Sequence, residues 1–239
     1  GNGVSINRMY SVTRNRETIF AEYIFTHHPD FKDVPQYYSR YSAFHIEGGD
    51  ILNINEHVLA IGISQRTEPD AIDEIAHNVF GDETSTIDTI LAFNIPVSRA
   101  FMHLDTVFTQ IDYDKFTIHP GIMGPLTVFE ITPDGKGGTK IRERNEDLES
   151  VLSEYVGEKV TLIPCGGGDR IAAEREQWND GSNTLCVRPG TVVVYQRNNV
   201  TNDVLYKNGI NCLVMPSAEL SRGRGGPRCM SMPAWREAL

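Results

Sequence analysis

The feature of this sequence that most constrains its fold is a recurring order of predicted elements. The apolar run at 58–63 predicts a buried strand, and apolar residues at helical spacing over 68–80 predict an amphipathic helix. Thr67 is the expected N-cap of this helix, and a second strand is expected at 89–93. A strand, a helix and a strand in this order indicate a sheet covered by a helix.

Two later stretches follow a similar plan. The second stretch begins with a predicted hairpin, whose turn is rich in Asp and Gly. Its expected elements are strands at 126–131 and 139–142, a helix at 146–155 and a strand at 160–163. The third has a strand at 191–195, a helix at 201–207 and a strand at 210–215. Such modules cannot bury their apolar faces alone, so the copies should pack together. Periodicity alone leaves open both a repeat fold and a generic α/β or α+β domain.

Composition restricts the class of protein. With 22 Lys and Arg against 32 Asp and Glu, the formal net charge is −10, which argues against a nucleic-acid partner. No apolar run approaches the roughly 20 residues that span a bilayer, so no membrane association is expected. No Pro/Gly/Ser-rich linker divides the chain, and residues 1–239 are therefore predicted to form one domain.

The cysteines and the first residues indicate where the chain works. Four cysteines without CxxC spacing indicate free thiols in a reducing, cytoplasmic compartment: Cys165, Cys186, Cys212 and Cys229. No signal peptide is recognised. The chain starts with Gly-Asn-Gly-Val and has no initiator Met, so it is expected to be a piece of a longer protein. The sequence leaves open whether it forms a homo-oligomer.

One cysteine lies in an unusual setting. Cys229 follows a glycine-rich loop that carries three arginines over 222–228. Nearby cations would stabilise the thiolate, which is the nucleophilic form of cysteine. A lone cysteine is more often an inert buried residue, and the basic loop is what favours the nucleophile.

His103 and Asp105 form a second candidate pair. They lie two residues apart in the segment 101–108, and on a strand they would point toward the same face. A His and a carboxylate on one face can divide proton transfer and cation binding. Without further context, a structural hydrogen-bonded pair is the simpler interpretation. The remaining histidines are scattered along the chain, so no metal site is expected.

Further charged residues fall near predicted element ends. Glu47 and Asp50 flank two glycines after a predicted strand ending at Ile46, and a tight turn there could aim both carboxylates into one pocket. For this tetrapeptide alone, a turn with solvated acids is the simpler interpretation. Arg14 and Arg66 are isolated cations of the kind usually found on surfaces. The polar segment 177–183 is interpreted as a structural loop.

These groups suggest one kind of chemistry. Carboxylates bind a planar guanidinium through paired hydrogen bonds, a thiolate can attack its central carbon, and a histidine can protonate the departing amine. Four segments in this order and spacing resemble the arginine deiminase family of guanidino-group-modifying enzymes: 47–50, 101–105, 175–181 and 222–229. The resemblance covers essentially the whole chain. It implies a pseudo-symmetric, five-bladed α/β propeller of hairpin–helix–strand modules.

The resemblance implies roles for individual residues. Cys229 matches the nucleophile and His103 the general acid and base. Glu47 matches the carboxylate that assists the histidine, and Asp105 the one that grips the guanidinium. The implied reaction hydrolyses L-arginine to L-citrulline and ammonia through a covalent thiouronium intermediate, without a cofactor.

The same resemblance assigns the substrate-binding residues. Arg14 and Arg66 match positions that hold the α-carboxylate of the substrate, and Arg224 matches a loop arginine that closes over the site. Asp50 is assigned to substrate binding with them.

The chain departs from the family at its start. Family members are longer at the N-terminus, with a first blade, a helical insertion and another guanidinium-binding aspartate. We therefore expect an incomplete propeller. The alternatives are a catalytically incomplete fragment that binds a partner or supports assembly, and a relative acting on another guanidino compound. Agmatine has no carboxylate, so Arg14 and Arg66 disfavour it as the substrate.

Overall fold

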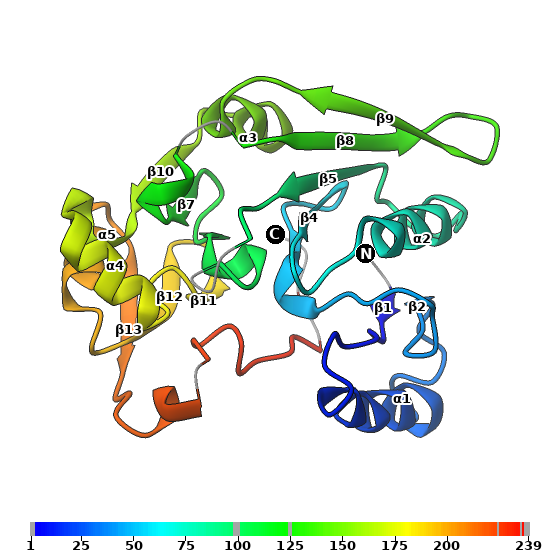
Figure 1. Cartoon of the computed structure of the whole chain (residues 1–239), viewed down its shortest axis with the longest axis horizontal. Coiled ribbons are helices and arrows are strands. Elements are labelled where there is room, and N and C mark those ends of the chain that lie inside the picture. Colours follow the sequence, from blue (N-terminus) through cyan, green and yellow to red (C-terminus); the bar gives the residue numbers. More distant parts are fainter. Residues whose placement is uncertain (1–2, 98–100, 124–125, 224, 235, 237–239) are drawn as a thin grey trace. The chain divides into compact units, whose positions relative to one another are not determined.

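The computed structural model describes residues 3–97, 101–123, 126–223, 225–234 and 236. It divides into two compact units, one formed by residues 1–104 and 126–145 and the other by residues 105–125 and 146–239. The structure is of the mixed α/β class, as predicted (Figure 1). The prediction of a single domain over 1–239 stays a prediction.

The first unit is built on a five-stranded sheet of order β3-β4-β5-β8-β9 (Figure 1). Its strands are β3 (Ile51–Asn53), β4 (Val58–Ile63), β5 (Thr89–Asn94), β8 (Val128–Pro133) and β9 (Thr139–Arg144). Strands β4 and β5 are parallel and are joined by helix α2 (Pro69–Phe80), whereas the other neighbours are antiparallel. The same unit contains β1 (Val4–Ser5), β2 (Gln36–Tyr38), α1 (Thr18–His27) and the 3₁₀ turns η1 (Arg14–Arg16) and η2 (Gly48–Asp50).

The core of the first unit lies between α2 and the sheet. The buried residues of α2 repeat at helical spacing: Ala71, Ile72, Ile75, Ala76 and Val79. They pack against sheet residues Leu59, Ile61, Ile90, Ala92 and Ile131. The predicted strand–helix–strand order over 58–93 is thus confirmed. The N-cap prediction is wrong, because the helix is capped by Glu68 and the Thr67 hydroxyl donates instead to Asp50.

The second unit has two three-stranded sheets, of order β10-β7-β6 and β11-β12-β13. The first contains β6 (Phe108–Gln110), β7 (Lys115–Ile118) and β10 (Thr161–Pro164), and the second β11 (Leu185–Arg188), β12 (Thr191–Tyr195) and β13 (Asn211–Met215). The helices are α3 (Leu148–Val156), α4 (Arg170–Trp178) and α5 (Asn199–Lys207), with 3₁₀ turns η4 (Pro120–Ile122), η5 (Cys165–Gly168) and η6 (Leu220–Gly223). Val192, Val194, Leu205, Ile210 and Ile163 belong to one buried cluster.

The expected module recurs three times, with one correction. An antiparallel pair, a helix and a parallel strand occur as β3-β4-α2-β5, β6-β7-α3-β10 and β11-β12-α5-β13. The hairpin β8–β9, predicted to open the second module, instead extends the first sheet by pairing with β5. The short pair β6–β7 takes its place in the module.

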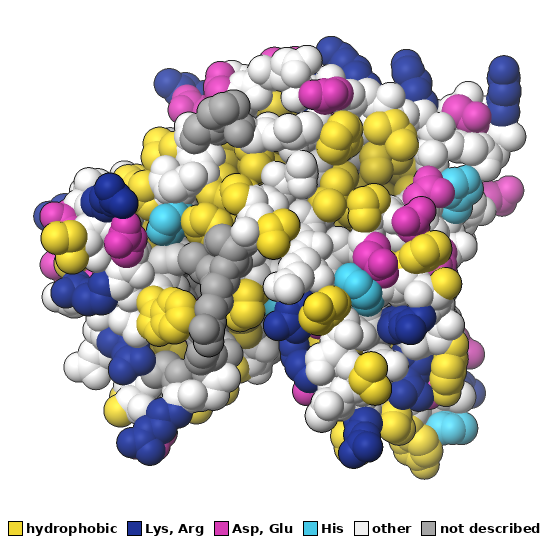
Figure 2. All heavy atoms as spheres, viewed as in Figure 1, with side chains coloured by type: hydrophobic (Ala, Val, Ile, Leu, Met, Phe, Trp, Pro, Cys, Tyr) yellow, Lys and Arg dark blue, Asp and Glu magenta, His cyan; other side chains and the backbone are white. Residues whose placement is uncertain are grey.

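Surface charge, helix hydropathy and cysteine pairing can each be compared with the sequence. On the face shown in Figure 2, Lys and Arg side chains are scattered with Asp and Glu side chains among them. Within the described residues, no helix combines the length and apolar character that crossing a membrane requires. All four cysteines are unpaired, so the prediction of free thiols is confirmed.

Candidate active site

The structure places the predicted site residues in two groups, one in each unit. The first unit holds Arg14, Glu47, Asp50, Arg66 and His103, and the second holds Asp105 and Cys229. Arg224 lies outside the described residues. The two groups are joined along the chain by the short 3₁₀ turn η3 (Leu104–Thr106).

Glu47 is the centre of the first group. It is 1 % exposed and precedes the turn η2. Nε2 of His103 donates to its Oε2 over 2.8 Å, and Nη1 of Arg14 donates to the same oxygen over 3.2 Å. Its Oε1 accepts from the backbone N–H of Tyr10 at 3.2 Å and from Nη1 of Arg66 at 3.5 Å. The carboxylate therefore orients the His103 ring while two arginines approach it.

The surroundings of Glu47 favour its ionised form. Burial acts to raise the pKa of Glu47, but the hydrogen bond from His103 and the charges of His103, Arg14 and Arg66 outweigh it. The net effect lowers the pKa of this carboxyl below its usual value. A carboxylate held ionised beside an imidazole stabilises the protonated imidazole, as a general acid requires.

Asp50 is completely buried at the other end of the same turn. Its Oδ2 accepts from the hydroxyls of Ser64 and Thr67, and its Oδ1 accepts from the N–H of Leu104. Burial raises the pKa of Asp50 to about 6, against the opposing effects of the His103 charge and these hydrogen bonds. The interpretation of 47–50 as a turn with solvated acids is therefore wrong, and no strand ends at Ile46.

The two arginines differ in their surroundings. Arg14 is half-exposed and also makes two hydrogen bonds to Glu17, at 3.1 and 3.2 Å. Arg66 is largely buried and lies over the ring of Tyr10, with its Cζ 5.1 Å from the ring centroid. Among the described residues, its buried Nε has no hydrogen-bond partner. Their assignment to the α-carboxylate of a substrate stays a prediction.

The segment of His103 and Asp105 is not the strand expected from the sequence. It forms the turn η3, because the N–H of Leu104 donates to Asp50 and the Thr109 hydroxyl donates to the carbonyl of Asp105, outside any sheet ladder. The prediction that both side chains share one face of a strand is wrong. His103 instead pairs with Glu47 in the first unit.

Asp105 and Cys229 meet in the second unit. Asp105 is fully buried, and its Oδ2 accepts from Nη1 of Arg228 at 2.7 Å. The Sγ of Cys229 lies 4.0 Å from the same oxygen. The other oxygen, Oδ1, is buried and has no hydrogen-bond partner among the described residues. A carboxylate oxygen without a partner among the described residues can accept a cationic donor there.

The described surroundings of the thiol raise its pKa rather than lower it. Although Cys229 is an exposed residue, desolvation of its sulfur, helped by the charge of Asp105, raises its pKa to about 12. The charge of Arg228 lowers the pKa of the thiol, but this effect is smaller than those of desolvation and Asp105. Arg222 is exposed and pairs with Glu219. The expectation that the basic loop stabilises the thiolate stays a prediction, because Arg224 of this loop lies outside the described residues.

Asn183 is a residue whose importance the sequence did not reveal. It is fully buried, its Nδ2 donates to the carbonyl of Asp105 at 3.3 Å, and its Oδ1 accepts from the N–H of Cys229 at 3.2 Å. A Cβ on Gly226 would lie 2.3 Å from Asn183 Oδ1, so a glycine is required there. The interpretation of 177–183 as a structural loop holds for its hydrogen bonds, but the loop also fixes two candidate site residues.

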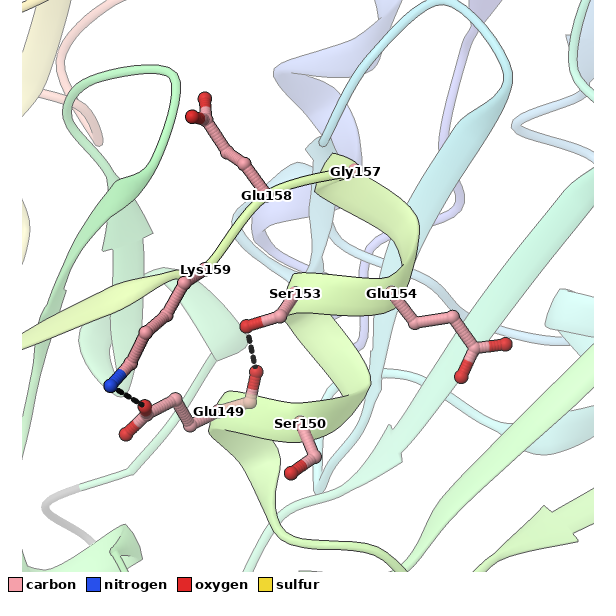
Figure 3. A pocket seen from close by; sticks show the side chains of 7 residues that line it. All are labelled: Glu149, Ser150, Ser153, Glu154, Gly157, Glu158 and Lys159. Carbon is pink, nitrogen blue, oxygen red and sulfur yellow. Dashed lines mark hydrogen bonds and ion pairs between the residues drawn. The ribbon is translucent and has the colours of Figure 1, made fainter.

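Two surface hollows are lined by none of these site residues. One has a volume of about 670 Å³ and is lined by α3 and the residues that follow it, including Glu149, Glu154, Glu158 and Lys159 (Figure 3). Lys159 pairs with Glu149 there at 3.6 Å, and the hollow contains no thiol or imidazole. The other, of about 210 Å³, lies beside the β8–β9 turn. Among the described residues, no three His, Cys, Asp or Glu side chains are placed to hold a metal ion.

Comparison with known proteins identifies the family. The family model for arginine deiminase matches residues 1–236. The chain belongs to the arginine deiminase family. It is 66% identical to the arginine deiminase of Treponema denticola over 242 residues and 57% identical to that of Clostridium perfringens over 243 residues. Each match covers the whole chain but 59% of the relative, so the chain spans about three fifths of the length of these curated proteins.

Solved structures with low sequence identity share the fold. A structure of mutant DDAH from Pseudomonas aeruginosa in complex with citrulline matches 96% of this chain and 70% of that chain, with a TM-score of 0.60 and 14% identity. SxtG, an amidinotransferase from Microseira wollei, matches 100% of this chain and 66% of that chain, with a TM-score of 0.65 and 12% identity. Both structures therefore share the fold of this chain.

Proposed function

We propose that this chain is the catalytic region of an arginine deiminase, which hydrolyses L-arginine to L-citrulline and ammonia in the cytoplasm. The support is its identity of 52–66% with curated arginine deiminases over the whole chain. The observation that carries the chemistry is the buried Asp105, whose unpartnered Oδ1 and nearby Cys229 thiol suit a guanidinium cation. The three modules are, in this proposal, blades of a single catalytic α/β propeller.

The proposed reaction has two steps at the guanidinium carbon. Asp105 binds the guanidinium, and the sulfur of Cys229 attacks Cζ as a thiolate. His103 gives a proton to the departing nitrogen, which leaves as ammonia and breaks the Cζ–N bond. Water then adds to the thiouronium carbon and passes a proton to His103. The hydroxyl of this adduct then loses its proton to solvent as the Cζ–S bond breaks, which releases citrulline and restores the thiolate.

The charged surroundings of the thiol suggest when the thiolate forms. Because the charge of Asp105 helps to raise the pKa of Cys229, a substrate cation bound at Asp105 would neutralise that charge and lower the pKa of the thiol. Glu47 would meanwhile stabilise the protonated form of His103. The substrate thus promotes formation of the nucleophile that attacks it.

The proposal assigns the other end of the substrate to arginines. Arg14 and Arg66 would hold the α-carboxylate, because a guanidinium binds a carboxylate through two hydrogen bonds, and Arg224 would close over the site. Arg14 and Arg66 already contact one carboxylate, that of Glu47. Both oxygens of Asp50 accept hydrogen bonds from within the protein, so Asp50 is not placed among these substrate-binding residues.

The test measures citrulline and ammonia with two proteins. One is the 239-residue chain, and the other is this chain joined to the part of the Treponema denticola relative that has no counterpart in it. Citrulline from both proteins would support a complete catalytic region. Citrulline from the joined protein alone would support the second candidate, a catalytically incomplete fragment, which the 59% coverage favours. Citrulline from neither would overturn the proposal.

A covalent trap tests the nucleophile in the same preparations. Acid quenching during turnover, followed by mass spectrometry, should find arginine less ammonia attached to the peptide of Cys229. Cys229→Ser should show no adduct and no turnover. Preferred turnover of agmatine or a methylated arginine would point instead to another guanidino substrate.

A further inference from the structure

We propose that Asp50 is a positioning residue that fixes His103 and Glu47 in their hydrogen-bonded arrangement, rather than a residue that binds substrate. The inference deepens the proposed function and rests on it for its catalytic consequence. The structural basis is the Asp50 network, defined as Asp50 with its three donors Ser64, Thr67 and Leu104.

The first connection runs from Asp50 to His103. Oδ1 of Asp50 accepts from the N–H of Leu104 at 2.8 Å, and this N–H belongs to the peptide that follows His103. This hydrogen bond holds the backbone at the peptide next to His103, where Leu104 begins a 3₁₀ turn and belongs to no strand. Holding this peptide limits the directions in which the His103 ring can point, so that Nε2 faces Glu47 at 2.8 Å.

The second connection runs from Asp50 to Glu47 through one hydroxyl. The Thr67 hydroxyl donates to Oδ2 of Asp50 at 2.6 Å and accepts from the N–H of Glu47 at 3.3 Å. One buried carboxylate thus holds the backbone of both partners of the His103–Glu47 pair. Ser64 adds a second hydroxyl donor to the same oxygen, at 2.7 Å.

Close packing around the Asp50 network leaves little room for the His103 ring and the Asp50 carboxylate to move. A Cβ on Gly49 would lie 2.8 Å from Cγ of His103. A Cβ on Gly62, in β4, would lie 2.5 Å from Oδ1 of Asp50 and 3.0 Å from Cβ of Leu104. Real Cβ atoms do not approach so closely, so both positions require glycine to let the ring and the carboxylate lie against the backbone.

A carboxylate suits this place better than an amide. The ionised group offers only acceptors, which matches three donors that reach it from two sides. With Asn at this position, an amide oxygen facing Leu104 would turn its NH₂ toward the hydroxyls. The Thr67 hydroxyl already accepts from Glu47, so its own hydrogen would lose its acceptor. Asp50→Asn should therefore loosen the network while it preserves volume.

The test compares Asp50→Asn with wild type by NMR and by kinetics. The NMR signal is the hydrogen-bonded imidazole proton of His103, assigned by its absence in His103→Gln. In Asp50→Asn this signal should shift or exchange faster, and kcat for arginine should fall about 10²-fold, with a much smaller change in KM. Asp82→Asn is the matched control, because Asp82 also accepts hydrogen bonds from a threonine and a tyrosine but is far more exposed.

A second pair of variants keeps the test decisive if Asp50→Asn does not fold. Thr67→Val removes the hydroxyl that connects Asp50 to Glu47, and Thr67→Ser retains it. The signal and kcat should change in Thr67→Val and return in Thr67→Ser. A folded Asp50→Asn with the wild-type signal and kcat would overturn the proposal, as would an unchanged Thr67→Val. If no protein makes citrulline, the proposed function fails, and the NMR comparison still decides the role of Asp50.

Discussion

Nη1 of Arg228 lies 2.7 Å from Oδ2 of Asp105, and the thiol of Cys229, the next residue, approaches the same oxygen at 4.0 Å. A guanidinium of the protein therefore already occupies one oxygen of the carboxylate that is proposed to bind the guanidinium of the substrate. The second oxygen is buried without a partner among the described residues. This relationship leads to two predictions of opposite sign for the reactivity of Cys229.

Arg228→Met should make Cys229 less reactive. The charge of Arg228 acts to lower the pKa of the thiol, and its removal also leaves Asp105 without its cationic partner. Alkylation by iodoacetamide between pH 7 and 9 should slow by about tenfold for each unit of pKa gained. Peptide mapping would follow Cys229 separately from the other cysteines. Arg222→Met, in the same loop but paired with Glu219 at the surface, should leave the rate unchanged. Equal rates in Arg228→Met and wild type would contradict the prediction.

Asp105→Asn should have the reverse effect on the thiol and still abolish catalysis. Removing the carboxylate charge eliminates the electrostatic contribution of Asp105 to the raised pKa of Cys229, so alkylation should accelerate. Loss of one partner of a buried charged contact costs about 2–5 kcal/mol, which corresponds to a fall of about 30-fold to about 5 × 10³-fold in kcat/KM for arginine. A faster alkylation rate combined with slower turnover would separate the two roles of Asp105. Unchanged alkylation would show that Asp105 does not control the thiol.

Asp50 should make stability depend on pH in an unusual direction. Its folded-state pKa of about 6 lies above the value of about 3.9 for an unfolded Asp, so the folded protein binds more protons between these pH values. This group therefore makes the protein more stable as the pH falls from about 7 toward about 4, by roughly 3 kcal/mol.

Urea unfolding of wild type and Asp50→Asn over this range would measure the effect. The lowered pKa of Glu47 contributes stability that is lost as the pH falls, which is the opposite direction. Because Asp50→Asn is also expected to loosen the His103–Glu47 pair, Thr67→Val, which loosens the same pair but keeps the Asp50 carboxyl group, is measured beside it to isolate the contribution of Asp50. A difference in unfolding free energy that stays constant with pH would contradict the raised pKa of Asp50.

Parts of the fold could be predicted because local pattern and tertiary structure agree there. The run of β4 and the helical spacing of α2 are long enough to show their periods, and both are confirmed. Strands β6 and β7 have three and four residues, too few to show alternation, so the second hairpin was assigned to β8 and β9. Pairing of β8 with β5 is a non-local contact that no local pattern encodes.

The candidate site was predictable only in part, for the same physical reason. Glu47, His103, Asp105 and Cys229 carry groups whose chemistry makes them candidates wherever they lie. Ordinary polar residues gain a role only through tertiary contacts. Asn183 is one such residue and connects the backbones of Asp105 and Cys229. Thr67 is another and connects the backbone of Glu47 to the carboxylate of Asp50. The turn η3 was missed because a side-chain acceptor, Asp50, takes the N–H of Leu104.

Arg66 should discriminate between arginine and agmatine. Agmatine carries the same guanidinium but no α-carboxylate, so it lacks the group that Arg66 is proposed to hold. Arg66 is largely buried, and truncating one partner of a desolvated Arg–carboxylate pair costs about 2–5 kcal/mol. Arg66→Ala should therefore lower kcat/KM for arginine by at least about 10-fold more than kcat/KM for agmatine, and Arg14→Ala should act in the same direction.

Arg16→Ala, an exposed neighbour in η1, is the control and should leave the ratio unchanged. Arg66→Ala and Arg14→Ala also weaken contacts to Glu47, which would slow the turnover of both substrates alike. Only the ratio of the two kcat/KM values therefore reports on binding of the α-carboxylate. If the ratio of the two kcat/KM values does not move in either variant, neither arginine binds the α-carboxylate, and the preference for arginine must come from elsewhere in the protein.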